Sequence, residues 1–179
     1  MFHHPGQRYV DAKQIVAQEG MVFLPLIIHG YASGFEYGIY RAMRALLREF
    51  VDAIAAPDYL ALLPYMQRTP ERDKVLFALR LALRNRCQVA TTLGYGPRYL
   101  HSIGQLHKGG PPTGVLLMFT ADAPDDLPIP GEPFGFAALQ RAQALGDFQA
   151  LSAPGRRVLR LHLGYNIEQG LQHIVHSVL

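Results

Sequence analysis

The run GVLLMFT at Gly114–Thr120 is apolar at every position between its first and last residues. A strand that meets water on one face alternates apolar and polar residues, whereas a run without alternation is typical of a strand buried on both faces. Sheets with both faces covered are mostly parallel, and parallel strands need long crossover connections that are usually helices. This stretch therefore predicts an α/β fold, and the flanking segments test that prediction.

Strand and helix signals alternate on the N-terminal side of this run. Asp58–Met66 is a strand candidate. A helix start follows at Thr69-Pro70-Glu71, with Thr at the N-cap, Pro at the first helical position and an acid in the first turn. This helix should extend to about Asn85, and the β-branched residues in Gln88–Thr92 indicate a short strand. Gly94–Pro112 reads as a long loop.

The same alternation continues on the C-terminal side. After a connector rich in Pro and Asp at Ala121–Pro133, we expect a helix at Phe134–Leu151, a strand at Arg157–Leu163, and a final helix at Ile167–Val178 with Asn166 as its N-cap. The order of elements implies βαβ units. We therefore predict an α/β three-layer sandwich with a mainly parallel sheet.

The N-terminal third has a different pattern. Met21–Ile28 reads as a short strand, at an edge or broken because of Pro25. His29–Gly38 reads as a loop, and Ile39–Ala55 carries apolar residues at helical spacing along one face. We therefore expect an N-terminal helical extension over residues 1–56, followed by an α/β domain over residues 57–179.

The charged-residue content and the net charge indicate which kinds of partner this chain can bind. Charged residues make up 17% of the 179 residues, compared with about 25% in a typical globular protein, which suggests that a partner covers part of the surface. The net charge of +3 fits an anionic ligand. Because no dense stripe of Lys and Arg is present, we expect no nucleic-acid partner.

Location and cofactors follow from a few residues. The single cysteine, Cys87, cannot form an internal disulfide, so we expect a cytoplasmic protein. Met21–Ile28 is far shorter than the ~20 residues that span a bilayer, so no membrane partner is expected. His173 and His176 stand at a spacing that can bind metal, but no third ligand is evident. We expect no metal and no organic cofactor.

The segment Thr91–Pro111 is the best candidate for a ligand site. Ligands of parallel sheets bind beyond the carboxyl ends of the strands, which points to the loops after Thr92, Thr120 and Leu163. Thr91–Pro111 contains five glycines and no acid. Its glycines allow backbone N–H groups to approach an anion, and its hydroxyl and basic side chains can donate to phosphate oxygens. Alternatively, its basic residues face water, as is usual for scattered basic residues on the common Gly/Pro-rich loops between strands, and neither G-x-x-x-x-G-K-[ST] nor G-x-G-x-x-G is present.

Three long runs resemble a known family: GYGPRYLHSIGQLHKGGPPTGVLLMFTAD (94–122), LPIPGEPFGFAALQRAQALGDFQAL (127–151) and GRRVLRLHLG (155–164). They resemble the C-terminal domain of the isomerase half of bacterial transaldolase/phosphoglucose isomerase fusion proteins, over roughly the last two thirds of the chain. The segment is also similar to sugar isomerase (SIS) domains, which are α/β sandwiches that bind phosphosugars.

The resemblance implies a glycolytic role in carbohydrate metabolism, in which glucose 6-phosphate and fructose 6-phosphate interconvert. It also implies that Ser102, Gly104, Gln105, His107 and Lys108 lie near a sugar-phosphate pocket. Together with the hydroxyl and basic residues of the same segment, the predicted substrate-binding set is Thr91, Thr92, Arg98, His101, Ser102, Gly104, Gln105, His107 and Lys108.

The catalytic residues cannot be assigned. Aldose–ketose isomerisation needs a carboxylate base. The candidates Glu36, Glu71, Glu132 and Glu168 show no catalytic partner, and the family signature N-P-F-D-x-P-x-V is absent. We therefore expect a sugar-phosphate-binding domain with weak or no isomerase activity alone.

Two other classes of function are open. Leu26–Gly34 resembles the oxyanion-loop region of α/β-hydrolases, but the G-x-S-x-G motif that such enzymes need is missing. A non-catalytic interaction module is the stronger alternative. It would dock onto a separate isomerase or transaldolase chain, or self-associate, as the low charge content and the helix at Ile39–Ala55 suggest.

Overall fold

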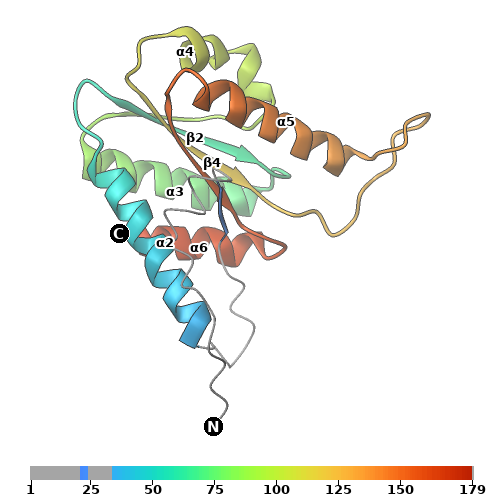
Figure 1. Cartoon of the computed structure of the whole chain (residues 1–179), viewed down its shortest axis with the longest axis horizontal. Helices are drawn as coiled ribbons and strands as arrows, with labels where there is room; N and C mark the ends of the chain where they lie inside the picture. The colour runs from blue at the N-terminus through green and yellow to red at the C-terminus, as the bar shows by residue number, and fades with distance from the viewer. Residues whose placement is uncertain (1–20, 24–33, 179) are drawn as a thin grey trace, which may run out of the picture.

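The computed structural model describes residues 21–23 and 34–178 of the chain. Five strands form one sheet in the order β1-β5-β4-β2-β3 (Figure 1). All neighbouring strands pair in parallel. The strands are β1 (Met21–Phe23), β2 (Tyr59–Tyr65), β3 (Ala90–Leu93), β4 (Gly114–Thr120) and β5 (Arg157–His162).

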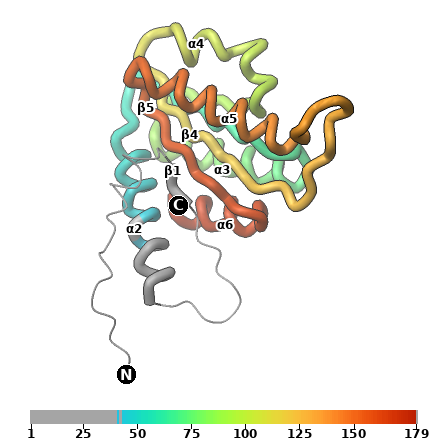
Figure 2. The backbone as a smooth tube through the Cα atoms, turned by 45° about the vertical axis from the view of Figure 1, so that its right-hand side comes forward, coloured from blue at the N-terminus to red at the C-terminus, as the bar shows by residue number. Residues whose placement is uncertain are grey.

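Helices cover both faces of the sheet, as Figure 2 shows for α3 and α6 on one side of β4 and β5 and α5 on the other. The first layer contains α2 (Gly34–Asp52), α3 (Pro70–Cys87) and α6 (Ile167–Val178). The second layer contains the 3-10 helix η1 (Arg98–His101), α4 (Gly104–Gly109) and α5 (Phe136–Ser152). The predicted three-layer α/β sandwich is therefore confirmed, and its sheet is parallel throughout the described strands.

The central strand β4 has the environment that its sequence indicates. All its residues are buried, and it lies between β5 and β2. Alternate residues of the neighbouring strand β2 belong to different layers: Leu60 and Leu62 pack with the α2–α3–α6 layer, whereas Ala61 and Leu63 pack with the α5 layer. Burial on both faces is the reason that neither strand shows polar alternation.

Both helix starts that the sequence indicates are present. The Thr69 side chain accepts a hydrogen bond from the backbone N–H of Arg72 at 3.2 Å, and Pro70 is the first residue of α3. Asn166 Oδ1 accepts from the backbone N–H of Gln169 at 3.1 Å, directly before α6. These side chains satisfy backbone donors that a helix leaves unpaired at its N-terminus.

The segment Gly94–Pro112 differs from the prediction, because it is not a simple loop. It contains η1 and α4, whose backbone is held by bonds such as Tyr99 N–H to Tyr95 O at 3.0 Å and His107 N–H to Ile103 O at 3.3 Å. Tyr99 and His107 are buried, and their rings contact Tyr65 and Tyr59 of β2. Tertiary burial of these two rings offsets a glycine-rich local sequence that by itself favours a turn.

The helix of the predicted N-terminal extension is displaced. It begins at Gly34 instead of Ile39 and ends at Asp52 instead of Ala55, so part of the predicted loop His29–Gly38 is helical. Of the predicted strand Met21–Ile28, residues 21–23 form the edge strand β1, and residues 24–28 lie outside the described residues.

Helix α2 packs onto the α/β body. Met43, Leu47 and Val51 belong to the same buried cluster as Leu171 and Ile174 of α6. The division of the chain at residue 56 stays a prediction, although the described helix shares its core with the sheet. Among the described helices, none has the length and the apolar character needed to cross a bilayer.

Candidate functional site

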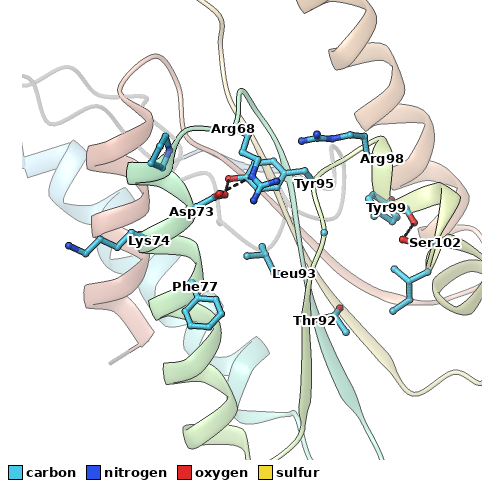
Figure 3. Close-up of a pocket in the computed structure, with 13 residues that line it drawn as sticks. Arg68, Asp73, Lys74, Phe77, Thr92, Leu93, Tyr95, Arg98, Tyr99 and Ser102 are labelled. Carbon is cyan, nitrogen blue, oxygen red and sulfur yellow. Dashed lines mark hydrogen bonds and ion pairs between the residues drawn. The ribbon is translucent and has the colours of Figure 1, made fainter.

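A pocket of about 1140 Å³ opens at the carboxyl end of the edge strand β3 (Figure 3). One wall comes from the segment before α3 and the first turns of that helix, the floor from β3 and the residues after it, and the other wall from η1. Its lining residues are Arg68, Pro70, Asp73, Lys74, Phe77, Thr92, Leu93, Gly94, Tyr95, Arg98, Tyr99, Ser102 and Ile103.

Two guanidinium groups lie close to the ring of Tyr95. Arg68 Cζ is 5.6 Å and Arg98 Cζ is 5.9 Å from the ring centroid, distances at which a cation is attracted to an aromatic face. The Tyr95 hydroxyl donates to Asp73 Oδ1 at 2.9 Å, and Arg68 Nε donates to Asp73 Oδ2 at 2.8 Å. Among the described residues, Asp73 is the only carboxylate that lines this pocket, and both its oxygens therefore have protein partners.

These contacts set the charge states of the pocket. The hydrogen bond from Arg68 lowers the pKa of Asp73, so its carboxyl group is ionised at neutral pH. Burial, with the hydrogen bond to Asp73 second, raises the pKa of Tyr95 to about 12, so the phenol is neutral. With Arg68, Lys74 and Arg98 against Asp73, the lining carries three positive charges and one negative charge. The pocket is thus net cationic.

Arg98 is the cation best placed for a ligand. Its side chain extends from η1 across the pocket towards Tyr95 (Figure 3), and no hydrogen bond or ion pair within the described residues engages its guanidinium. Lys74 points away from Tyr95 in the same view. A free guanidinium offers five N–H donors in a planar arrangement that matches a carboxylate or phosphate.

Three of the predicted substrate-binding residues, Thr92, Arg98 and Ser102, line this pocket. The hydroxyl groups of Thr91 and Thr92 are buried on β3 and have no hydrogen-bond partner within the described residues. His101 and Gln105 are exposed and stand outside the lining.

The predicted residues on α4 face a different environment. Gly104 is buried against Leu100. His107 is buried, its ring stacks on Tyr59 with centroids 5.6 Å apart, and its Nδ1 lies 2.9 Å from the Tyr59 hydroxyl. Burial lowers the pKa of His107. These two residues pack the layer beneath α4 and do not line the pocket.

Lys108 also turns away from the pocket. Its Nζ donates to Asp147 Oδ1 at 2.7 Å. Asp147 is buried on α5 and accepts further hydrogen bonds from the hydroxyls of Tyr65 and Tyr99, the latter at 3.1 Å. Burial raises the pKa of both tyrosines, which keeps them neutral donors. Sequence reasoning missed Asp147, although its place between Ala144 and Leu151 on the buried face of α5 is a usable signal.

Sequence reasoning also missed the wall formed by Arg68, Asp73 and Phe77. Ligand sites were expected after β3, β4 and β5, and this wall follows β2. In parallel sheets ligands usually bind where the strand order reverses, which in this sheet is between β2 and β4. The pocket instead lies at the edge of the sheet, beside β3. A basic residue directly before a helix start that follows a buried strand is the signal that could have located the wall.

The glutamates weighed as bases have other positions. Glu168 accepts from Arg72 at 2.9 Å, Glu71 and Glu132 are exposed, and the side chain of Glu36 lies outside the described residues. Glu71, Glu132 and Glu168 do not line the pocket. In the part of the chain that the structure describes, no group of three or more His, Cys, Asp or Glu is placed to hold a metal.

Comparison with known proteins supports the fold class. No family model and no curated protein matches the chain. A similar solved structure is a hypothetical protein from Thermus thermophilus, which is 20% identical with a TM-score of 0.61 over 82% of this chain and 40% of that chain. The chain therefore spans less than half the length of that protein. At this identity the likeness shows the fold alone, an α/β sandwich, here with a cationic pocket at its sheet edge.

Proposed function

We propose that this chain is a sugar-phosphate-binding domain of the glucose-6-phosphate isomerase type, related to SIS domains and working in the cytoplasm. The observation that carries the proposal is the net cationic pocket beside β3, whose lining includes Ser102 and Arg98, a guanidinium that no hydrogen bond or ion pair within the described residues engages. The sequence resemblance to transaldolase/phosphoglucose isomerase fusion proteins names the substrate class.

The lining suits the two parts of a sugar phosphate. Guanidinium groups form strong, charge-assisted hydrogen bonds with phosphate oxygens, so we propose that Arg98 binds the phosphate. The ring of Phe77, a residue that is 51% exposed, offers apolar surface against which the C–H face of a sugar can pack. Ser102, whose hydroxyl now donates to the Tyr99 carbonyl at 3.2 Å, would supply a further polar contact.

The same geometry supports a catalytically incomplete domain. Isomerisation needs a carboxylate that is free to remove a proton from carbon and has a pKa suited to that step. Asp73, the one carboxylate that the described part of the chain contributes to the lining, is engaged by Arg68 and Tyr95 and has a lowered pKa, which makes it a weak base. We propose that interconversion of glucose 6-phosphate and fructose 6-phosphate requires residues from another chain or domain.

Calorimetric titration with fructose 6-phosphate tests this function. We expect saturable binding to the wild-type chain, at least tenfold weaker binding to Arg98→Gln, and unchanged binding to Arg141→Gln. Arg141 is a matched control because it is exposed on α5 and outside the pocket. Equal affinity for inorganic phosphate would reduce the proposal to a general anion site, and no binding to the folded wild-type chain would reject it.

A coupled assay for glucose 6-phosphate formation separates binding from catalysis. We expect no turnover above background from the purified chain at saturating fructose 6-phosphate. Robust turnover would show that a base is present which the pocket geometry does not reveal.

An interaction module is the second candidate. The observation that favours it is a set of exposed large apolar side chains between β4 and α5, among them Leu127 and Phe134. Such a module would bind a separate isomerase or transaldolase chain, or a second copy of itself.

A further inference from the structure

The segment between β4 and α5, residues 121–135, projects from the body of the molecule as a long excursion (Figure 1, gold). We call it the arm. It contains four prolines and four acidic residues, and no lysine or arginine. The arm is therefore conformationally restricted and strongly acidic in a chain whose net charge is +3.

The arm is internally ordered. Its tip is a turn in which the N–H of Glu132 donates to the carbonyl of Ile129 at 3.0 Å, with Pro130 and Gly131 between them and a φ of +87° at Gly131. This arrangement is a type II turn, which prefers proline and then glycine at these two positions. Behind the tip, Pro128 and Gly135 form an antiparallel bridge.

The base of the arm is tied to α5. The carboxylate of Asp126 accepts hydrogen bonds from the backbone N–H groups of Ala137 at 2.7 Å and Ala138 at 3.3 Å. The N–H of Phe136 donates to the carbonyl of Leu127 at 2.9 Å. A segment that is already ordered loses little conformational entropy when it binds, so the arm is pre-organised for docking.

Large apolar side chains on the arm and beside it are exposed to solvent. Leu127 is 69% exposed, Phe134 43%, and Phe136, at the start of α5, 55%. An ordered surface that exposes large apolar and aromatic side chains is typical of a protein interface, whose rim is polar. Asp125 and Glu132 are exposed on the same arm and accept no side-chain hydrogen bond within the described residues.

The same chain carries a surface of opposite charge. The ring of Phe77 is 51% exposed at the pocket described above, and Lys74 and Arg98 are exposed on its two walls. No residue of the arm lines this pocket, so the arm does not cover it within one chain. An acidic, apolar arm and a basic, aromatic pocket are complementary in charge and in chemistry.

We propose that two copies of this chain form a two-fold dimer in which the arm of each copy docks on the Phe77–Lys74–Arg98 surface of the other. Each copy carries both halves of the contact, so a reciprocal arrangement closes the assembly and uses both arms. Leu127 and Phe134 pack against Phe77, and Asp125 and Glu132 face Lys74 and Arg98. Because Arg98 and Phe77 also line the proposed sugar-phosphate pocket, a docked arm and a bound sugar phosphate would compete for this surface.

A charge-reversal experiment followed by sedimentation velocity tests the contact. An arm variant carries Asp125→Lys and Glu132→Lys, and a surface variant carries Lys74→Glu and Arg98→Glu. All four positions are exposed, so both variants should fold, which circular dichroism checks. We expect wild type to be dimeric and each variant alone to be monomeric.

Mixing the two variants gives the decisive result. In the mixed dimer, the basic arm of the arm variant meets the acidic surface of the surface variant. The acidic arm of the surface variant meets the basic surface of the arm variant, as in wild type. Both contacts are attractive, so a heterodimer should form. A wild-type chain that is monomeric at all concentrations, or variants that do not associate on mixing, would overturn the proposal.

Two variants that replace exposed apolar side chains give an independent check. Leu127→Ser with Phe134→Ser should weaken dimerisation at least tenfold, because it removes the anchors of the interface. Leu145→Ser on α5, which removes another exposed leucine, should leave the dimer unchanged. A dimer that survives the first change and is lost with the second would place the interface elsewhere.

Sugar-phosphate binding is read separately, by calorimetry on the monomeric Leu127→Ser/Phe134→Ser variant. Binding without wild-type dimerisation would reject the arm contact alone, and dimerisation without binding would reject the proposed function alone.

Discussion

Lys108 Nζ lies 2.7 Å from Asp147 Oδ1, at the point where α4 meets α5. The same carboxylate accepts from the hydroxyl of Tyr99, a residue of the pocket lining. The Lys108–Asp147 pair therefore helps to hold Tyr99, and with it the η1 wall of the pocket, in position. Lys108 is thus engaged by Asp147 and does not line this pocket, and the ligand contact that the sequence indicates for it stays a prediction.

Replacing Asp147 should destabilise the fold strongly. Asp147→Ala leaves two buried tyrosine hydroxyls and a partly buried ammonium group without their acceptor. Removing one partner from a buried ionic network typically costs about 3–5 kcal/mol. Urea denaturation followed by circular dichroism should show a loss in that range. A loss below about 1 kcal/mol would mean that water replaces the carboxylate at no great cost.

Lys108→Met should separate positioning from ligand contact. The methionine keeps the length of the apolar stem but removes the charge, which leaves Asp147 with its two tyrosine donors. We expect lower stability with the affinity for fructose 6-phosphate changed less than twofold. Calorimetry and urea denaturation on the same preparation measure both. A tenfold loss of affinity at unchanged stability would return Lys108 to the ligand site.

Stability should fall as the pH decreases, in part because of His107. Burial lowers the pKa of His107 in the folded state, so the unfolded chain binds more protons at mildly acidic pH. This contribution is present above the unfolded pKa of about 6.5 and is lost as the pH falls below that value. His173, whose pKa is also lowered by burial, adds a term of the same sign.

The His107→Gln variant isolates the first of these terms. Its free energy of unfolding, measured by urea denaturation at several pH values between about 5 and 8, should depend less steeply on pH than that of wild type. His173→Gln serves as the comparison. Parallel curves for wild type and His107→Gln would contradict the assignment.

Two glycine substitutions should have opposite signs. A Cβ atom at Gly96 would overlap the ring of Tyr65, which is fully buried and cannot move aside, so Gly96→Ala should cost about 2 kcal/mol or more. Gly146 lies inside α5 with nothing near its Cβ position, so Gly146→Ala should stabilise by about 0.5–1 kcal/mol. Thermal melts of both variants beside wild type check the signs. If Gly96→Ala leaves the melting temperature unchanged, the loop at Gly96 can move away from Tyr65 of β2 locally.

The sheet and its helix starts could be predicted because their signals are local. Gly114–Thr120 is apolar throughout since both its faces are covered, and Thr69 and Asn166 reveal helix starts because an N-cap acts on backbone N–H groups only two or three residues away. Periodicity likewise indicated the buried face of α2, although its first turn carries glycines that hide the true start.

The candidate site could be predicted only in part. Thr92, Arg98 and Ser102 follow a strand end, where the general rule for parallel sheets points, and they line the pocket. His107 and Lys108 belong to the same glycine-rich segment, but α4 turns them towards Tyr59 and Asp147. No local pattern announces this turn, because α4 and η1 depend on rings that are buried against other elements.

By itself, the sequence determined the layered α/β architecture, since hydrophobic periodicity and capping act over a few residues. Only the tertiary structure decided which charges are free and which are neutralised. Asp73 meets Tyr95 and Asp147 meets Lys108 across separations of 22 and 39 residues. Coulombic and hydrogen-bond energies depend on distance in space, and the chain brings these groups together only when the core packs.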